Sequence, residues 1–301
     1  MTADPSSNPH QPRKVLLVGT DALASETVSR VLPGWTLIRV RDNNAALALL
    51  QRDCVELVVT GEKTAGHEDI ELLRKIRRAW PHTRMIILTD ESTPSDVIGA
   101  IRLRAFSYFS KPYTQTALGD MLRLASEAPA WDDGIELISA TPEWIVVKAR
   151  CDLGTAERLF QFAHEVADLP EAEQEKVGLA FREMLLNAME HGGKFDPTKH
   201  VEISYTRARH AVMCRIKDPG EGFSRGENPL VATSNPPDDP LKHLKYREAQ
   251  GVRPGGYGMS IAQMMVDEVI YGEKGNEVLL IKYLDLTPDS KREGTDESVP
   301  R

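Results

Sequence analysis

Cysteine is scarce in this chain of 301 residues, which contains Cys54, Cys151 and Cys214 and no C-x-x-C pair. An odd number of widely separated cysteines gives neither a disulfide framework nor the ligand spacing of a zinc site. Such usage is typical of a reducing compartment. We therefore expect a cytoplasmic protein without structural disulfides.

Long hydrophobic runs and blocks of positive charge are also absent. No apolar stretch approaches the roughly 20 residues that cross a bilayer, and the N-terminus lacks the charged-then-apolar order of a signal peptide. Lys and Arg are scattered, and the formal net charge is −8. Because neutralising phosphate charge supplies most of the affinity for nucleic acids, we expect neither a nucleic acid nor a membrane as a partner.

Hydrophobic residues make up 41% and charged residues 27% of the chain, which is the composition of folded globular proteins. A chain of this length has room for two domains, each with its own core. Polar stretches at residues 1–13 and 287–301 predict disordered tails. Two folded domains are therefore expected between the tails.

The first half of the chain, residues 14–126, alternates short apolar runs with amphipathic stretches. The runs, which predict strands, are Val15–Val18, Leu37–Val40, Leu57–Val59, Met85–Leu88 and Tyr108–Phe109. Helical patterns follow them near residues 22–32, 43–52, 68–79, 94–104 and 114–126. Five β–α units with continuous aliphatic strands predict a doubly wound α/β domain, in which helices cover both faces of a parallel five-stranded sheet.

Residues at and near the ends of these strands carry a resemblance to a known family. Glu56–Gly61 and Ile70–Leu73 match the family's third strand and third helix, and Thr89 and Ser110–Pro112 match further positions. On these residues the segment resembles the receiver domain of response regulators. The resemblance implies that Thr89 is the switch hydroxyl and Lys111 the phosphate-sensing lysine.

The reactive residues of that family are missing here. Gly61 stands where the phosphoryl-accepting aspartate is expected, and Gly19 and Thr20 stand where the metal-binding acidic pair is expected. Magnesium needs oxygen ligands, usually carboxylates, and Asp21 is one residue beyond the pocket. We therefore predict a pseudo-receiver that is not phosphorylated and that serves for docking or dimerisation.

A short linker at residues 127–134 contains Pro129 and Gly134, which are typical of connecting segments. A histidine autokinase needs a pair of long helices that carry a phosphorylatable histidine ahead of its ATP domain. Between residue 126 and a predicted strand at 135–138 there is no room for such helices. The sequence therefore excludes this class of kinase.

The second half, residues 135–286, contains an unusual helical pattern at 171–192. Glu183, Asn187 and His191 are spaced so that they lie along one row of this helix, bordered by large apolar residues. A polar row in apolar surroundings is costly unless a polar group binds it. Taken alone, the pattern also fits an amphipathic surface helix.

Two glycine-rich loops follow this helix. Asp218–Phe223 comes after a predicted strand at Ala211–Lys217, and Pro254–Ser260 opens the apolar helix Ile261–Val266. Either loop alone is a weak signal. In this order and spacing, the helix and loops resemble the N, G1 and G2 boxes of the ATPase superfamily that includes gyrase, histidine kinases and anti-sigma-factor serine kinases. The resemblance implies an α+β Bergerat-type ATP-binding sandwich.

The resemblance also implies roles for the matching residues. Asp218 accepts the adenine amine, while Gly220 and Gly222 let the backbone approach the base closely. Asn187 offers an amide oxygen to magnesium. Glu183 is the general base for the attack on the γ-phosphate.

The second loop and the segment before it complete the expected site. Gly256 and Gly258 stand just before a helix, whose N-terminus favours phosphate. Residues 224–254 correspond to the ATP lid, and Arg253 is a candidate phosphate contact. His191 either contacts phosphate or ends its helix.

The closing pattern Asn276–Lys282 looks like the last strand of the anti-sigma-factor kinases. We therefore predict a serine/threonine protein kinase of that type, using ATP and Mg²⁺ in a partner-switching pathway. The resemblance implies a STAS-domain antagonist as substrate, a sigma factor as a further partner, and a homodimer. The alternative is an ATP-gated binding module that sequesters a sigma factor or other regulator without transferring phosphate. A gyrase-like machine is disfavoured, because no transducer domain follows residue 286.

Overall fold

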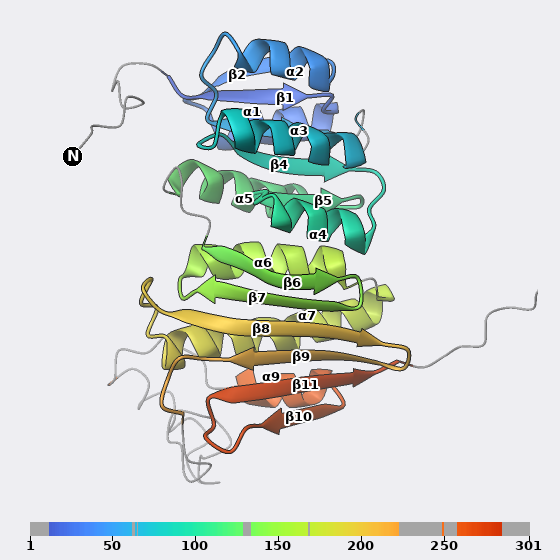
Figure 1. Cartoon of the computed structure of the whole chain (residues 1–301), viewed down its shortest axis with the longest axis vertical. Coiled ribbons are helices and arrows are strands. Elements are labelled where there is room, and N and C mark those ends of the chain that lie inside the picture. The colour runs from blue at the N-terminus through green and yellow to red at the C-terminus, as the bar shows by residue number, and fades with distance from the viewer. Residues whose placement is uncertain are drawn as a thin grey trace, which may run out of the picture.

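The computed structural model describes residues 12–61, 64, 66–128, 134–167, 169–222, 249 and 258–284. Figure 1 shows two sheets stacked along the long axis of the molecule, with helix α6 between them. The expected tails lie almost wholly outside the described residues. The same holds for the expected lid, for Arg253 and for Gly256.

The first sheet is parallel and has the strand order β2-β1-β3-β4-β5. Its strands are β1 (Lys14–Val18), β2 (Thr36–Val40), β3 (Leu57–Thr60), β4 (Arg84–Thr89) and β5 (Ser107–Ser110). The helices are α1 (Ala22–Val31), α2 (Asn43–Leu50), α3 (Gly66–Ala79), α4 (Pro94–Arg102) and α5 (Gln115–Glu127). The predicted five-stranded doubly wound domain is therefore confirmed.

Burial on both faces of this sheet explains its continuous aliphatic strands. Leu16 and Val18 belong to the core beneath α2, α3 and α4, whereas Val15 and Leu17 belong to the core beneath α1 and α5. All four side chains are 0–1% exposed. A strand buried on both faces gains nothing from alternating polar residues, so the sequence shows an uninterrupted run.

The second sheet is antiparallel and has the order β10-β11-β9-β8-β7-β6. Its strands are β6 (Ile135–Thr141), β7 (Trp144–Arg150), β8 (His200–Ala208), β9 (Ala211–Lys217), β10 (Glu268–Tyr271) and β11 (Glu277–Tyr283). Helices α6 (Leu153–Val166), α7 (Glu171–Asn187) and α9 (Gly258–Met265) cover one face. This arrangement confirms the predicted α+β sandwich, although the sequence reading had not identified β8 or β10.

The predicted helix at 171–192 needs a correction. The α-helix ends at Asn187 and continues as the π-helical turn η1 (Ala188–Gly192). The amide of Gly193 donates to the Ala188 carbonyl at 2.9 Å. A π-turn contains an extra residue, so the α-helical spacing from which the position of His191 was predicted does not continue past Asn187.

Helix α6 ties the two domains together. Strand β5 lies at the edge of its sheet, where backbone groups have no neighbouring strand. Arg158 Nε donates to the Phe106 carbonyl at 2.8 Å, and Gln161 Nε2 donates to the Tyr108 carbonyl at 2.9 Å. Glu165 continues this row of α6 by one more turn. The β5 edge of the first domain is therefore docked on a helix of the second.

Candidate nucleotide-binding site

Helix α7 presents two of the expected site residues to the start of α9. A Cβ built on Gly258 would lie 2.7 Å from Glu183 Oε2 and 3.2 Å from Asn187 Nδ2. Any side chain at position 258 would collide with Glu183 and Asn187, so only glycine allows α9 to approach α7 this closely. Glu183 and Asn187 therefore lie together against the N-terminal end of α9.

The carboxylate of Asp218 lies beside the end of the π-turn. A Cβ on Gly192 would come within 2.0 Å of Asp218 Oδ1 and 2.5 Å of its Cβ. A Cβ on Gly220 would come within 2.9 Å of Gly192 Cα. The π-turn thus brings the α7 end and the loop after β9 into backbone contact at Asp218.

Gly192 belongs to the candidate site through its contact with Asp218, and the sequence pattern alone did not predict that contact. The signal was a glycine pair directly after a polar helix row, but its contact with a loop more than twenty residues away depends on the tertiary fold.

The Asp218 side chain is half-buried and has one hydrogen bond within the described part of the chain, from the Gly220 amide at 2.7 Å. Burial raises the pKa of Asp218, and the Gly220 hydrogen bond partly opposes that rise. No cation pairs with this carboxylate among the residues that the structure describes. It therefore has acceptor capacity for a donor group on a bound molecule.

Asn276, at the start of β11, fixes the loop that holds Asp218. Its carbonyl accepts from the Asp218 amide at 2.9 Å, and its Nδ2 donates to the Gly220 carbonyl at 3.2 Å. Gly222 has φ +86°, and a Cβ there would come within 1.7 Å of the Lys274 carbonyl. Gly222 is thus required by the neighbouring turn, a reason that the sequence reading did not give.

The phosphoryl pocket of the first domain is filled by its own backbone. A Cβ on Gly61 would lie 2.3 Å from Thr20 Cα and 2.8 Å from the Gly19 carbonyl oxygen. Lys111 forms ion pairs with Asp90 at 3.0 Å and with Asp21 at 3.7 Å. There is no room for an acceptor side chain at position 61.

Comparisons with known proteins agree with these two halves. Residues 15–123 match the response regulator receiver domain family model, and residues 149–282 match the family model described as a histidine kinase-like ATPase domain. Neither match alone covers half of the chain. The chain therefore contains a receiver domain followed by a histidine kinase-like ATPase domain, a combination that fits a signalling protein and implies ATP binding.

Curated relatives include response regulator and transcriptional regulatory proteins. FleR, a response regulator protein of Pseudomonas aeruginosa, is 32% identical over 111 residues, which cover 36% of this chain and 24% of FleR. The hydrogenase transcriptional regulatory protein HoxA of Cupriavidus necator is 26% identical over 157 residues, covering 49% of this chain and 32% of HoxA. The chain thus spans between a quarter and a third of the length of these relatives.

Solved receiver structures cover the same part. The receiver domain of an HD domain-containing protein from Pseudomonas fluorescens Pf-5 is 28% identical, covers 39% of this chain and 96% of that chain, and has a TM-score of 0.35. CheY4 of Vibrio cholerae is 21% identical, with coverage of 38% and 99% and a TM-score of 0.33.

Two features are absent from the residues that the structure describes. None of the helices in these ranges combines the length and apolar character that crossing a membrane requires. Within the same ranges, no three or more His, Cys, Asp or Glu side chains gather into a metal-binding group.

Proposed function

We propose that the second domain is a serine/threonine protein kinase of the anti-sigma-factor type, dependent on ATP and Mg²⁺, that acts in a partner-switching pathway. The observation that carries this proposal is the placement of Glu183 and Asn187 against Gly258. One turn beyond Asn187, the same helix reaches Asp218 through Gly192. A base, a metal ligand and an adenine acceptor thus belong to one continuous site.

The residues present fit a nucleotide. Asp218 is a half-buried carboxylate with spare acceptor capacity, which suits an adenine amine. The glycines at 192, 220 and 258 let the site side chains pack directly against backbone, where any Cβ would collide with Asp218, Glu183 or Asn187. Asn187 would hold Mg²⁺ through its amide oxygen, and the amides at the start of α9 favour phosphate. Gly256 belongs to the same proposed cradle and lies outside the described residues.

Glu183 is the proposed general base. Bound ATP with its magnesium ion supplies the phosphoryl group. The Glu183 carboxylate would accept the proton of the attacking serine or threonine hydroxyl, since a carboxylate within hydrogen-bonding reach of that hydroxyl raises its nucleophilicity. A protein hydroxyl as the acceptor also agrees with the absence of a histidine-bearing helix pair between the two domains.

The first domain is proposed to act as a surface and not as a phosphoryl acceptor. Its pocket at Gly61 is filled by the Thr20 backbone, and its β5 edge is docked on α6. We propose a STAS-domain antagonist as the substrate, a sigma factor as a further partner, a homodimeric assembly and a cytoplasmic location.

The test is incubation of the full chain with γ-labelled ATP, Mg²⁺ and each STAS-domain antagonist from the same cell. Acid-stable label on a serine or threonine of one antagonist supports the kinase. ATP-dependent complex formation without label on any candidate would favour the alternative, a binding module that sequesters a sigma factor or other regulator. If neither label nor an ATP-dependent complex appears, both functions are wrong.

A further inference from the structure

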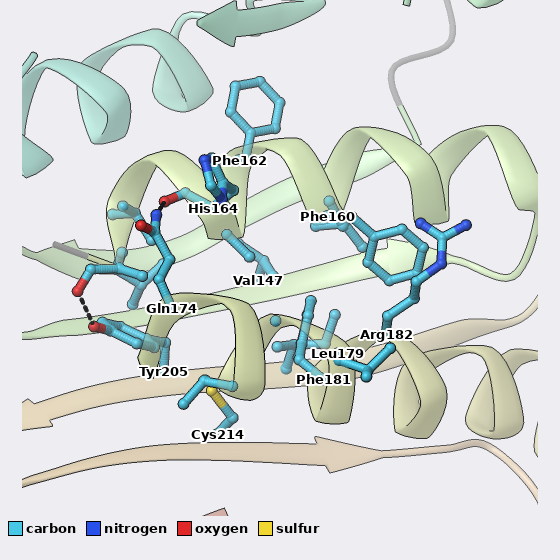
Figure 2. A pocket seen from close by; sticks show the side chains of 18 of the residues that line it. Val147, Phe160, Phe162, His164, Gln174, Leu179, Phe181, Arg182, Tyr205 and Cys214 are labelled. Atoms are coloured by element: carbon cyan, nitrogen blue, oxygen red, sulfur yellow. Dashed lines mark hydrogen bonds between the residues drawn. The ribbon is translucent and has the colours of Figure 1, made fainter. Parts of the chain in front are cut away.

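The second domain contains a cavity against α7, the helix that also carries Glu183 and Asn187. It lies between α6, α7 and the sheet, and its volume is about 380 Å³. Figure 2 shows side chains from both helices and from the strands converging on it. The lining residues include Val147, Val177, Phe181, Tyr205 and Cys214.

This volume is too large for a packing defect. Protein interiors contain few voids larger than a water molecule. An apolar cavity of about 150 Å³ in another protein stays dry and binds benzene, and small-molecule sites occupy about 300–1,000 Å³. By scaling from benzene, the cavity accommodates a ligand of about 15 non-hydrogen atoms.

The lining disfavours an anionic ligand, and the one carboxylate that lines the cavity, Glu175, is exposed to solvent. Arg182 is engaged by both oxygens of Glu157, at 2.7 and 3.2 Å, and its guanidinium lies 4.4 Å from the ring centre of Phe160. Burial lowers the pKa of His164, which favours its neutral form. Among the described lining residues no unpaired cation is available for an anionic head group, and burying an unpaired charge is costly.

Limited polarity remains at one end. His164 and Gln174 lie near each other at the end of the cavity away from Phe160 and Arg182 (Figure 2). Gln174 Nε2 donates to the His164 backbone carbonyl at 2.5 Å, and the Tyr205 hydroxyl donates to the Ala167 carbonyl at 3.0 Å. The Gln174 carbonyl and the His164 imidazole are left to orient a single polar group.

The shape of the cavity favours a small molecule over a protein partner. Its walls are deep, with Phe162, Cys214 and Val147 only 3%, 6% and 7% exposed. Leu179 is the one strongly exposed large apolar side chain among the described lining residues. A stable protein interface would need about 1,200 Å² of buried surface, whereas this pocket is a local feature of about 380 Å³.

Helix α7 connects the cavity to the nucleotide site. At 3.6 residues per turn, Gly178 in the cavity wall and Asn187 in the nucleotide site lie about 180° apart around the helix. On the far side of the cavity, α6 is held to β5 by Arg158 and Gln161. A ligand between α6 and α7 would therefore press a helix that carries Glu183 and Asn187 against one that is fixed to the receiver domain.

We propose that this cavity binds an uncharged, largely apolar small molecule, and that its occupancy changes nucleotide affinity through α7. The binding step does not depend on the proposed kinase activity. The coupling step depends only on the ATP binding that the domain family implies.

The probe is N-phenyl-1-naphthylamine, an uncharged dye of about this size whose fluorescence rises in apolar surroundings. Its charged counterpart is 8-anilino-1-naphthalenesulfonate, which carries a sulfonate on a similar ring system. The full-length chain should bind the uncharged dye saturably, one molecule per chain, and about tenfold or more tightly than the sulfonate, since the latter would bury an unpaired charge. Equal affinity for both dyes, or no saturable binding, would overturn the proposal.

Two substitutions at Gly178 provide a variant that should block the cavity and a matched control. A Cβ built there meets no atom within 4 Å, so both Gly178→Phe and Gly178→Ala should fold, and each replaces a helical glycine with a better helix former. Gly178→Phe should lower affinity for the uncharged dye about tenfold, whereas Gly178→Ala should bind like the wild type. Equal dye binding by the two variants would place the dye elsewhere and overturn the assignment.

Coupling is measured by titrating ATP with and without saturating dye. Dye should change the ATP dissociation constant of the wild type and Gly178→Ala at least about threefold, and that of Gly178→Phe much less. Hydrogen exchange should slow in α6 and α7 when dye binds. Dye binding with unchanged ATP affinity would contradict the coupling and leave the cavity site supported. Loss of ATP binding in every variant without dye would instead count against the nucleotide site.

Discussion

The carboxylate of Glu165 on α6 accepts two hydrogen bonds from Ser110 at the end of β5, from the amide at 3.0 Å and from Oγ at 2.5 Å. Its other oxygen accepts from Gln161 Nε2 at 2.8 Å. Burial nevertheless raises the pKa of Glu165 to about 7 from its ordinary value of 4.5. The domain junction therefore contains a carboxyl group that is only partly ionised near neutral pH.

The junction should make stability depend on pH. The pKa of Glu165 is raised in the folded state. The contribution of its protonated form to folding stability is therefore fully present below pH 4.5 and is lost as pH rises through about 7. Glu165→Gln removes this titration. The free energy of unfolding of the wild type relative to that of the variant should fall by about 2–3 kcal/mol between pH 4.5 and 8. Denaturant titrations across this range measure the difference.

Asp69 also has a raised pKa, but its titration does not affect the comparison of the wild type with Glu165→Gln. Burial raises the pKa of Asp69 in α3 to about 6, which makes stability fall with rising pH in both proteins. That shared trend cancels when the variant curve is subtracted from the wild-type curve. Parallel curves for the two proteins would show that Glu165 does not titrate as argued.

Restoring the missing aspartate should not restore receiver chemistry. In Gly61→Asp the new Cβ would lie 2.3 Å from Thr20 Cα, a backbone atom that cannot step aside without moving its loop. We expect this variant to lose about 1–3 kcal/mol of stability by overpacking. Neither it nor the wild type should gain a phosphoryl group from acetyl phosphate. Gly34→Asp is the control, since a Cβ at Gly34 meets nothing within 4 Å.

The sequence predicted those features that depend on local pattern. Residues Val15–Val18 of β1 are all aliphatic and buried, which is typical of a strand covered on both faces. Thr93 caps α4 ahead of Pro94 with a capping box to Asp96, a local signal of a helix start. Strand β8, HVEISYTRA, mixes charged and apolar residues on a half-exposed strand and was missed.

Tertiary contacts could not be read in this way. The π-turn after Asn187, the approach of Gly192 to Asp218 and the role of Asn276 arise where separate segments meet. The junction gave no signal at all, because Arg158 and Gln161 look like ordinary surface residues of an amphipathic helix until β5 is placed beside them. Local spacing selected the candidate residues, whereas the fold determines what they touch.

Gly192→Ala should weaken ATP binding. Its Cβ would lie 2.0–2.5 Å from three atoms of Asp218, including the Asp218 Cβ, so the carboxylate cannot rotate away and must be displaced. Losing a buried hydrogen bond to the nucleotide costs about 1–3 kcal/mol, which corresponds to roughly a 5–150-fold rise in the dissociation constant. Calorimetric titration measures it. Gly34→Ala should bind ATP like the wild type, and equal affinities for the two variants would remove Gly192 from the site.

Substitutions at Asp218 and at Glu183 should affect ATP binding and phosphoryl transfer differently. Asp218→Asn replaces an acceptor with an amide that can leave a buried group unpaired, so ATP affinity should fall by an amount equivalent to about 1–3 kcal/mol. Asn187→Ala should weaken nucleotide binding only when Mg²⁺ is present, because it removes the proposed oxygen ligand. Glu183→Ala should keep ATP affinity within a few-fold of the wild type, since in the proposed arrangement its carboxylate meets the attacking hydroxyl.

Phosphate transfer by Glu183→Ala should fall by about 10²–10⁴-fold, the usual contribution of a general base. The same preparations serve for nucleotide titration and for phosphorylation of the antagonist, so that loss of binding is not mistaken for loss of catalysis. If the domain is instead a binding module, the wild type and Glu183→Ala would form the same ATP-dependent complexes, and neither would label its partner. If Glu183→Ala abolishes ATP binding outright, Glu183 holds the nucleotide and its assignment as the base is wrong.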